Sequence, residues 1–207
     1  TITVTGTNDA PVVSSASINA VEAGASVPLG LTAPTDVDAT NVLTITVTGV
    51  PAVGQVQLAD GTPVANGATV TAAQLAGLRY LPPADYDGAA AVGGFTYNVN
   101  DGTVSVAGSA SITLAAVNDA PVNTLPSAQI TNEDTSLAIT GLAVADVDAG
   151  AGSMTVTLSV TNGTLTVTGG ISEGDGTSTI NLNSGTMTVA NGLEIDDLNV
   201  GVNGGTA

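Results

Sequence analysis

The chain has 207 residues and a formal charge of −17, because 18 acidic residues stand against a single basic one, and it contains no His and no Cys. This charge excludes nucleic acid as a partner and disfavours anionic membrane surfaces, while the missing His and Cys exclude disulfides, catalytic triads and soft-metal sites. With one Phe, three Tyr and no Trp, a core must consist mainly of Val, Leu, Ile and Ala, and no apolar run approaches the roughly 20 residues of a membrane span.

In chain order, the predicted elements are short strands in which apolar, mostly β-branched residues alternate with Thr, Ser or Asn. This alternation occurs at residues 1–5, 42–50, 95–99, 105–114, 153–160, 163–169 and 178–182. Turn signals separate the strands at Asp60-Gly61, Asn66-Gly67, Asp101-Gly102, Asn162-Gly163 and Asp175-Gly176. Residues 71–78 are expected to form one short helical turn. The pattern predicts an all-β fold of antiparallel Greek-key β-sandwiches joined end to end.

Two motifs recur in the sequence at the same distance. "NDAPV" stands at residues 8–12 and 118–122, and "DVDA" at residues 36–39 and 146–149, so both repeat after 110 residues. A fixed period of this kind indicates repeated copies of one structural unit. The predicted organisation is the last strand of a preceding repeat (1–7), a complete β-sandwich (8–117) and a second β-sandwich (118–207). The second is expected to be C-terminally incomplete, because the counterpart of "FTYNVNDG" (residues 95–102) belongs near residues 205–212.

The acidic residues fall into groups when the strands are traced up and down the sandwich. One end of the repeat is predicted to hold Asn8, Asp9, Asp36, Asp38 and Asp101. The other end is predicted to hold Glu22, Asp85 and Asp87 with the next linker, Asn118 and Asp119, to which the second repeat adds Asp146 and Asp148. Carboxylates that converge in this way repel one another unless a cation neutralises them.

The chemistry of these groups favours Ca²⁺, which takes six to eight oxygen ligands from carboxylates, amides and carbonyls. Zn²⁺ and copper prefer His or Cys, and Mg²⁺ tends to keep several of its waters. The alternative is that the same Asp and Asn residues are ordinary turn and cap residues on solvated loops.

The order of these motifs resembles a known family. "NDAP" followed by "DVDA", with Glu22 between them and "DYDG" and "FTYNVNDG" downstream, resembles the cadherin-like and immunoglobulin-like repeats of giant bacterial surface adhesins, which often carry RTX-type export signals. The resemblance covers nearly all of residues 1–170. It implies Ca²⁺ between successive domains, held by the linker (Asn118, Asp119), the loop (Asp146, Asp148) and the base of the preceding domain (Glu22, Asp85, Asp87). In the same way, Asp9, Asp36, Asp38 and Asp101 would serve the preceding junction.

The chain departs from the family pattern at several positions. Its linker is shorter than the cadherin "DxNDN", and Glu133 matches Glu22 only with a shift of one residue, while Asp134 has no partner in the first repeat. Residues 193–198, "LEIDDL", fall near the "DYDG" position, so that Glu194, Asp196 and Asp197 are either a further base site or a solvated turn.

Taken together, these features predict a non-catalytic spacer of a secreted bacterial cell-surface adhesin, in which Ca²⁺ stiffens an extended rod for adhesion and biofilm formation. Its expected partners are neighbouring repeats of the same chain, with neither nucleic acid nor membrane insertion. The alternative is an extracellular filament or sheath whose copies join by β-strand addition. An enzyme is not expected, because the Asp85 and Asp87 pair lacks the aromatic platform that a glycosidase would need.

Overall fold

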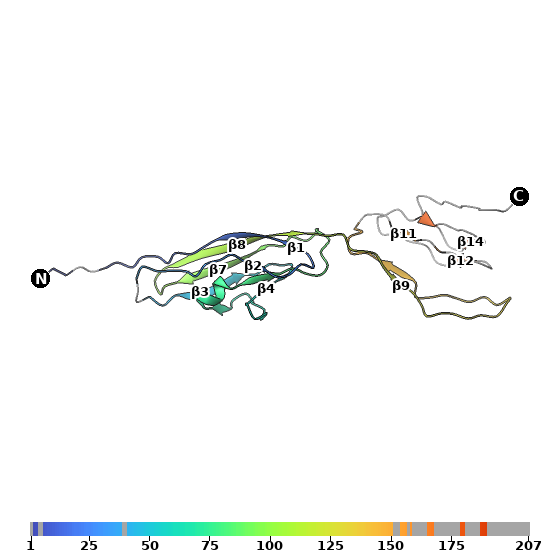
Figure 1. Cartoon of the computed structure of the whole chain (residues 1–207), viewed down its shortest axis with the longest axis horizontal. Helices are drawn as coiled ribbons and strands as arrows, with labels where there is room; N and C mark the ends of the chain where they lie inside the picture. Colours follow the sequence, from blue (N-terminus) through green and yellow to red (C-terminus); the bar gives the residue numbers. More distant parts are fainter. Residues whose placement is uncertain are drawn as a thin grey trace. The chain divides into compact units, whose positions relative to one another are not determined.

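The computed structural model describes residues 2–3, 6–38, 41–150, 154–156, 158, 165–167, 179–180 and 187–189. The chain divides into two units, Thr1–Asp119 and Ala120–Ala207 (Figure 1). Almost all of the regular structure is β-strand, which confirms the predicted all-β class. The boundary between the units follows Asp119, two residues beyond the predicted one.

Two sheets make up the first unit. The larger contains, in spatial order, β1 (Ala16–Val21), β8 (Ser105–Ala115), β7 (Gly94–Asn100), β3 (Thr44–Gly49) and β5 (Thr69–Val70). The smaller contains β2 (Val27–Pro28), β6 (Arg79–Leu81) and β4 (Gln55–Gln57). Inward and outward residues alternate along each long strand, as period-two patterning requires. The predicted strands at 42–50, 95–99 and 105–114 therefore correspond to β3, β7 and β8.

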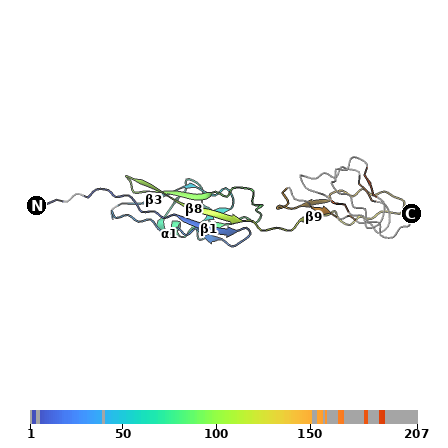
Figure 2. The same ribbon diagram turned by 90° about the horizontal axis from the view of Figure 1, so that it is seen from above.

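In the first unit, one strand pair differs from the prediction of an antiparallel sandwich. β1 pairs with β8 in parallel, from Ala16 opposite Ala110 to Val21 opposite Ala115, whereas the other pairs among the described strands of this unit are antiparallel. The cause is topological: both strands run away from the end that holds Asp101, so that placing them side by side makes them parallel (Figure 2).

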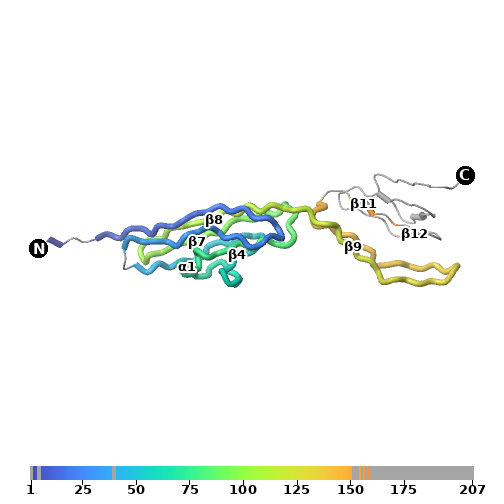
Figure 3. Tube along the Cα trace, viewed as in Figure 1, coloured from blue at the N-terminus to red at the C-terminus, as the bar shows by residue number. Residues whose placement is uncertain are grey.

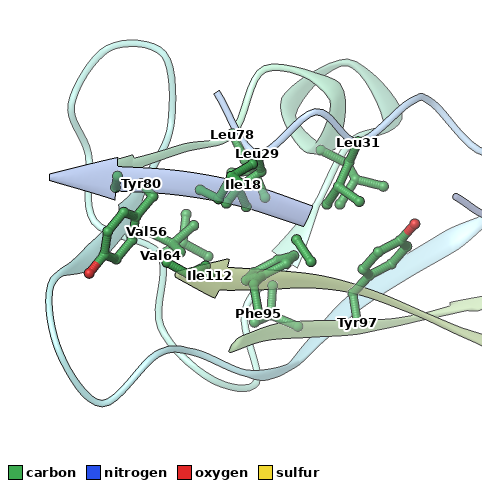
Figure 4. Close-up of a cluster of buried hydrophobic side chains, with 14 of the residues drawn as sticks. Ile18, Leu29, Leu31, Val56, Val64, Leu78, Tyr80, Phe95, Tyr97 and Ile112 are labelled. Atoms are coloured by element: carbon green, nitrogen blue, oxygen red, sulfur yellow. The ribbon is translucent and has the colours of Figure 1, made fainter. Parts of the chain in front are cut away.

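The core lies between the two sheets, where Ile18, Phe95 and Ile112 of the larger sheet pack in one cluster with Val56 of the smaller sheet and with Leu29 and Leu78 next to its strands (Figure 4). Aliphatic side chains are the majority, as predicted, but the aromatic residues of the chain are also buried there: Phe95, Tyr80, Tyr86 and Tyr97. Each Tyr hydroxyl donates a hydrogen bond to a backbone carbonyl: Tyr80 to Val53, Tyr86 to Ala90 and Tyr97 to Ser14. A buried Tyr keeps its apolar contacts without leaving a polar atom unsatisfied in this way.

The expected helical turn is α1 (Ala72–Ala76). The hydroxyl of Thr71 accepts from the Gln74 backbone N–H, and the Gln74 side chain accepts from the Thr71 N–H, which forms a capping box. Leu75 anchors the helix in the core.

The second unit begins with the same local structure as the first. Its strands β9 (Val122–Thr124) and β10 (Ala143–Ala145) pair antiparallel, with Val122 opposite Ala145 (Figure 3). In the first unit the isolated bridge joins Val12 to Thr35, which is the same pair displaced by 110 residues. The repeat read in the sequence is thus also a repeat of strand register.

Further along the second unit, two described strand pairs are parallel, which also differs from the predicted antiparallel pairing: β11 (Thr155–Val156) with β13 (Thr179–Ile180), and β12 (Leu165–Val167) with β14 (Met187–Val189). These strands fall within the predicted ranges 153–160, 178–182 and 163–169, except for β14, which was not predicted. The predicted turns at Asn162-Gly163 and Asp175-Gly176 lie outside the described residues.

Candidate functional site

The structure brings together the five residues predicted for the N-terminal end of the repeat. We call this group, with Asn41, the N-terminal acidic cluster. The backbone N–H of Asp9 donates to Asp38 Oδ2 at 2.7 Å, and the Asp38 N–H donates to Asp36 Oδ1 at 2.8 Å. Asn8 Nδ2 donates to Asp101 Oδ2 at 2.9 Å, which ties the linker to the turn before β8. Residues separated by up to 93 positions in the sequence therefore meet at one end of the sandwich.

Asp101 is the most buried member of this cluster, with 6% of its surface exposed. Its Oδ1 accepts from the backbone N–H groups of Val104 and Thr103, at 2.6 and 2.7 Å. Three hydrogen bonds lower the pKa of this carboxyl below its ordinary value, because each of them stabilises the charged form. In order of decreasing effect, they come from Val104, Asn8 and Thr103. Asp101 thus stabilises its own turn and also binds Asn8 of the N-terminal linker.

Asn41 belongs to this cluster and was missed by the sequence reasoning. Its Nδ2 donates to Asn8 Oδ1 at 3.2 Å and to Asp36 Oδ2 at 3.4 Å. The only sequence signal is an amide residue a few positions after the "DVDA" motif. In this arrangement, amide and backbone N–H groups donate to the carboxylate oxygens of the cluster. Among the described residues, no three His, Cys, Asp or Glu side chains form a group that could hold a metal ion.

Glu22 is the distinctive residue at the opposite end of the first unit. It follows β1, and only 4% of its surface is exposed. Its backbone N–H donates to the Ala115 carbonyl at 3.0 Å, and the next N–H, of Ala23, donates to the Pro83 carbonyl at 2.7 Å. Its Oε2 is buried and accepts no hydrogen bond in the part of the chain that the structure describes.

Two further residues predicted for this end, Asp85 and Asp87, lie in the loop between β6 and β7. Asp85 and Asp87 are exposed on either side of the buried Tyr86, and Asp87 Oδ1 accepts from the Ala89 N–H at 3.0 Å. Their loop lies against the end of β8, because a Cβ on Gly88 would be 3.7 Å from the Ala116 Cβ.

The second linker, Asn118 and Asp119, begins three residues after β8 ends, so it leaves from this same end of the unit. Asn118 is exposed, and its Nδ2 donates to the Asp119 carbonyl at 2.6 Å, as Asn8 Nδ2 does to the Asp9 carbonyl at 2.9 Å. Asp119 is half-buried.

In the second unit, Asp146 and Asp148 are half-buried, and the Asp148 N–H donates to Asp146 Oδ1 at 2.9 Å, which repeats the Asp36 and Asp38 geometry. Glu133 is exposed, unlike Glu22. However, the residue after each Glu has a left-handed backbone, Asp134 with φ of 58° and Ala23 with φ of 52°. The turn after Glu133 therefore matches the turn after Glu22, with the predicted shift of one residue relative to the 110-residue repeat. In this match, Asp134 is the counterpart of Ala23. Glu194, Asp196 and Asp197 lie outside the described residues.

Comparison with known proteins identifies the repeat. The sequence matches the family described as the bacterial Ig domain over residues 8–114, whereas the search of curated proteins returned no match. Domains of this family are typically structural rather than enzymatic, and typically occur on the cell surface or outside the cell. Within the described residues, no helix has the length and apolar character needed to cross a lipid bilayer. With the match covering more than half of its length, the chain belongs to the bacterial Ig domain family.

Proposed function

We propose that this chain is a stretch of spacer repeats from a large bacterial surface adhesin, and that Ca²⁺ bound at the acidic ends of the repeats stiffens their linkers. The observation that carries the calcium proposal is the buried Glu22 carboxylate with an oxygen that accepts no hydrogen bond among the described residues. Burial of a carboxylate oxygen that accepts no hydrogen bond raises the free energy of the folded state by roughly several kcal/mol, unless a cation or a proton neutralises the charge.

The surroundings of Glu22 favour a cation with oxygen ligands. The loop with Asp85 and Asp87 and the linker with Asn118 and Asp119 belong to the same end of the unit, and they offer only carboxylate, amide and carbonyl oxygens. Ca²⁺ accepts such ligands in irregular geometry, which suits loops better than the strict octahedron of Mg²⁺. The ion would supply positive charge to these carboxylates and would link loops that are distant in sequence.

By the 110-residue repeat, the N-terminal acidic cluster and its counterparts Asp146 and Asp148 would supply further ligands, and so would Glu133, the counterpart of Glu22. The hydrogen bonds to Asp36, Asp38 and Asp101 keep these carboxylates in fixed orientations. Extracellular Ca²⁺ modules bind with Kd of about 10⁻⁴ to 10⁻³ M, so such sites would fill outside the cell and stay empty inside it. The spacer would then be flexible before export and stiff afterwards.

The test is a thermal melt of the whole chain in EDTA and in millimolar CaCl₂, with small-angle scattering on both samples. We expect Ca²⁺ to raise the melting temperature, because a ligand that binds only the folded state stabilises it, and to lengthen the particle. MgCl₂ at the same concentration is the control for ionic strength and divalent charge. Equal melts and equal scattering in EDTA and CaCl₂ would remove the calcium proposal and leave the acidic residues as turn and cap residues.

A second candidate function is assembly of copies by strand addition, and one observation in the second unit favours it. Residues 126–131 correspond to β1 after 110 residues, yet they form no strand, and Ile130 within them is 92% exposed. Light scattering after gel filtration, across a range of protein concentrations, tests this function. Growth of particles with concentration would support the filament, and a constant monomer mass would exclude it.

A further inference from the structure

We infer that two copies of this chain associate side by side through the outer face of the larger sheet of the first unit. The observation that carries the inference is the distribution of charge. In a chain with a formal charge of −17, the five strands of this sheet contain no charged residue. The inference does not depend on calcium, and its surface is not the exposed segment 126–131 that favours strand addition.

Short, uncharged side chains make up this outer face. Along β8, inward residues such as Ile112 and Leu114 are buried, and the exposed residues that alternate with them are Ser105, Ala107, Ser109, Ser111, Thr113 and Ala115. The same pattern continues across the sheet, because Asn98 of β7 lies opposite Thr46 of β3 on one side and opposite Ala107 on the other. None of these outward side chains is longer than Asn, so the backbone of a second sheet can approach closely.

The carboxylates of the first unit lie outside this face. The N-terminal acidic cluster is at one end of the unit, Glu22 and the loop with Asp85 and Asp87 are at the other, and Asp60 belongs to the turn that follows β4. Two copies that meet at these ends bring like charges together, which is unfavourable. Two copies that meet at the larger sheet bring only neutral groups into contact.

Burial of this face carries a small penalty for polar side chains. Thr48 Oγ1 donates to Thr96 Oγ1 at 3.0 Å, and Asn100 Oδ1 accepts from the Gly102 N–H at 2.8 Å, so these groups are already bonded within the unit. Polar groups that keep their hydrogen bonds lose little when water is removed. Ala, Ser and Thr also lose less side-chain entropy than the long charged residues of an ordinary protein surface.

The size of the face fits a weak dimer. At roughly 3.3 Å per residue and about 4.8 Å between strands, the five strands cover about 500 Å². Two copies packed face to face would therefore bury about 1,000 Å² in total, which is at the lower limit of specific interfaces. The smaller sheet offers less area, because its strands have only two or three residues, and its outer face carries the charged Arg79.

Sedimentation equilibrium of the whole chain in EDTA tests the association, from about 1 μM to 1 mM protein. The contact uses the same face of both copies, so it closes at two copies. We expect the mass to rise to that of a dimer in 150 mM NaCl, and the dissociation constant to be several-fold higher in 10 mM NaCl, where the acidic ends of the two copies are screened less, with a screening length of about 30 rather than 8 Å. Circular dichroism shows that the chain is folded in both buffers. A monomer mass at every concentration in 150 mM NaCl, or growth beyond two copies, would overturn the inference.

A pair of variants then locates the contact. Ser109→Glu and Gln55→Glu each add one negative charge at an exposed strand position, the first on β8 in the larger sheet and the second on β4 in the smaller. Like charges at an interface oppose binding, so Ser109→Glu should raise the dissociation constant at least about ten-fold, and Gln55→Glu less than about two-fold. Equal effects of the two variants would contradict the inference, because net charge alone would explain them.

Cross-linking gives an independent readout, because the chain has no Cys of its own. With a short bismaleimide, Ser109→Cys should form a covalent dimer in 150 mM NaCl, while Gln55→Cys should stay monomeric. A dimer that forms equally well from both variants would assign the association to random collisions and overturn the proposed face.

Discussion

At the scale of single residues, two carboxylates with similar burial have opposite surroundings. Asp101 receives three hydrogen bonds from N–H donors, whereas Glu22 keeps one buried oxygen without any among the described residues. Hydrogen bonds to a carboxylate offset the loss of its hydration, and without them burial is unfavourable. Asp101 is therefore expected to stabilise the metal-free fold, and Glu22 to destabilise it.

The first prediction concerns Glu22→Gln, which keeps the size of the side chain and removes its charge. In EDTA we expect the free energy of unfolding to rise by about 1–3 kcal/mol, since a neutral amide is less unfavourable to bury than an unpaired carboxylate. In CaCl₂ the variant should lose much of the gain in melting temperature shown by the native chain. Urea titrations in both buffers measure the two effects.

The matched control for that prediction is Asp60→Asn, which removes one negative charge from an exposed turn at residues 59–61. It should leave the response to Ca²⁺ unchanged. If both variants reduced the response equally, general charge would explain it and Glu22 would have no special role.

The second prediction concerns acid. The pKa of Asp101 lies below its ordinary value of 3.8 in the folded chain, so the unfolded chain takes up a proton first as the pH falls. The stability that Asp101 contributes is then complete above about pH 3.8 and is lost as the pH falls through the folded pKa. Asp101→Asn should lower stability at neutral pH and flatten the decline below pH 4, roughly, in urea titrations at several pH values. If the stability of Asp101→Asn declined as steeply with falling pH as that of the native chain, other carboxylates would be the cause of the decline.

At the scale of elements, the smaller sheet depends on a close approach between a turn and a ring. Gly54, directly before β4, has a φ of 73°, and its Cα lies against the Tyr80 ring on β6, so that a Cβ there would overlap the ring and hydroxyl. The Tyr80 hydroxyl meanwhile donates to the Val53 carbonyl at 2.9 Å. Glycine is required at this position both for its backbone conformation and for its lack of a side chain.

The third prediction follows from this contact. Gly54→Ala should destabilise the fold by about 2–4 kcal/mol, as the sum of left-handed strain and overpacking. Gly61→Ala is the matched control, because Gly61 has a φ of 88° but open space around its Cα. This variant should be less stable than the native chain by only about 1–2 kcal/mol. Thermal melts of both variants give the difference. Equal losses would show that the Tyr80 ring moves aside without a measurable penalty.

At the scale of the whole molecule, the dominant property is a charge of −17 with one Arg as the sole basic residue. Arg79 donates to the Ser26 hydroxyl at 2.9 Å and to the Ser26 carbonyl at 2.5 Å, so its hydrogen bonds join β6 to the residue before β2. The carboxylates thus have little internal countercharge. Their mutual repulsion opposes the compact state and falls when salt screens it.

The fourth prediction is that NaCl stabilises the metal-free chain. Raising its concentration from about 10 to 150 mM shortens the screening length from about 30 to 8 Å, and the melting temperature in EDTA should rise. With Ca²⁺ present the same change should have a smaller effect, because bound cations have already reduced the repulsion. A melting temperature in EDTA that does not change with NaCl would mean that the carboxylates are too far apart to repel one another.

Much of this protein could be predicted from sequence because the relevant signals are local. Alternation along a strand, Gly in tight turns and the capping residues around α1 depend on neighbours within a few positions. The 110-residue repeat predicted repeated units, and the structure shows the same register at Val12 and Val122. The grouping of Asn8, Asp36 and Asp101 at one end followed from counting strand directions, which needs only the order of strands.

What only the tertiary structure decided depends on which strands become neighbours. Composition, alternation and the recurring motifs by themselves determined an acidic, all-β chain of repeats with carboxylate and amide oxygens at the turns. They could not determine that β1 lies beside β8, that Asn41 joins the cluster, or that Glu22 is buried while Glu133 is exposed. The physical reason is that pairing, burial and hydrogen-bond partners arise from packing between segments far apart in the chain, where local sequence carries no record of the contact.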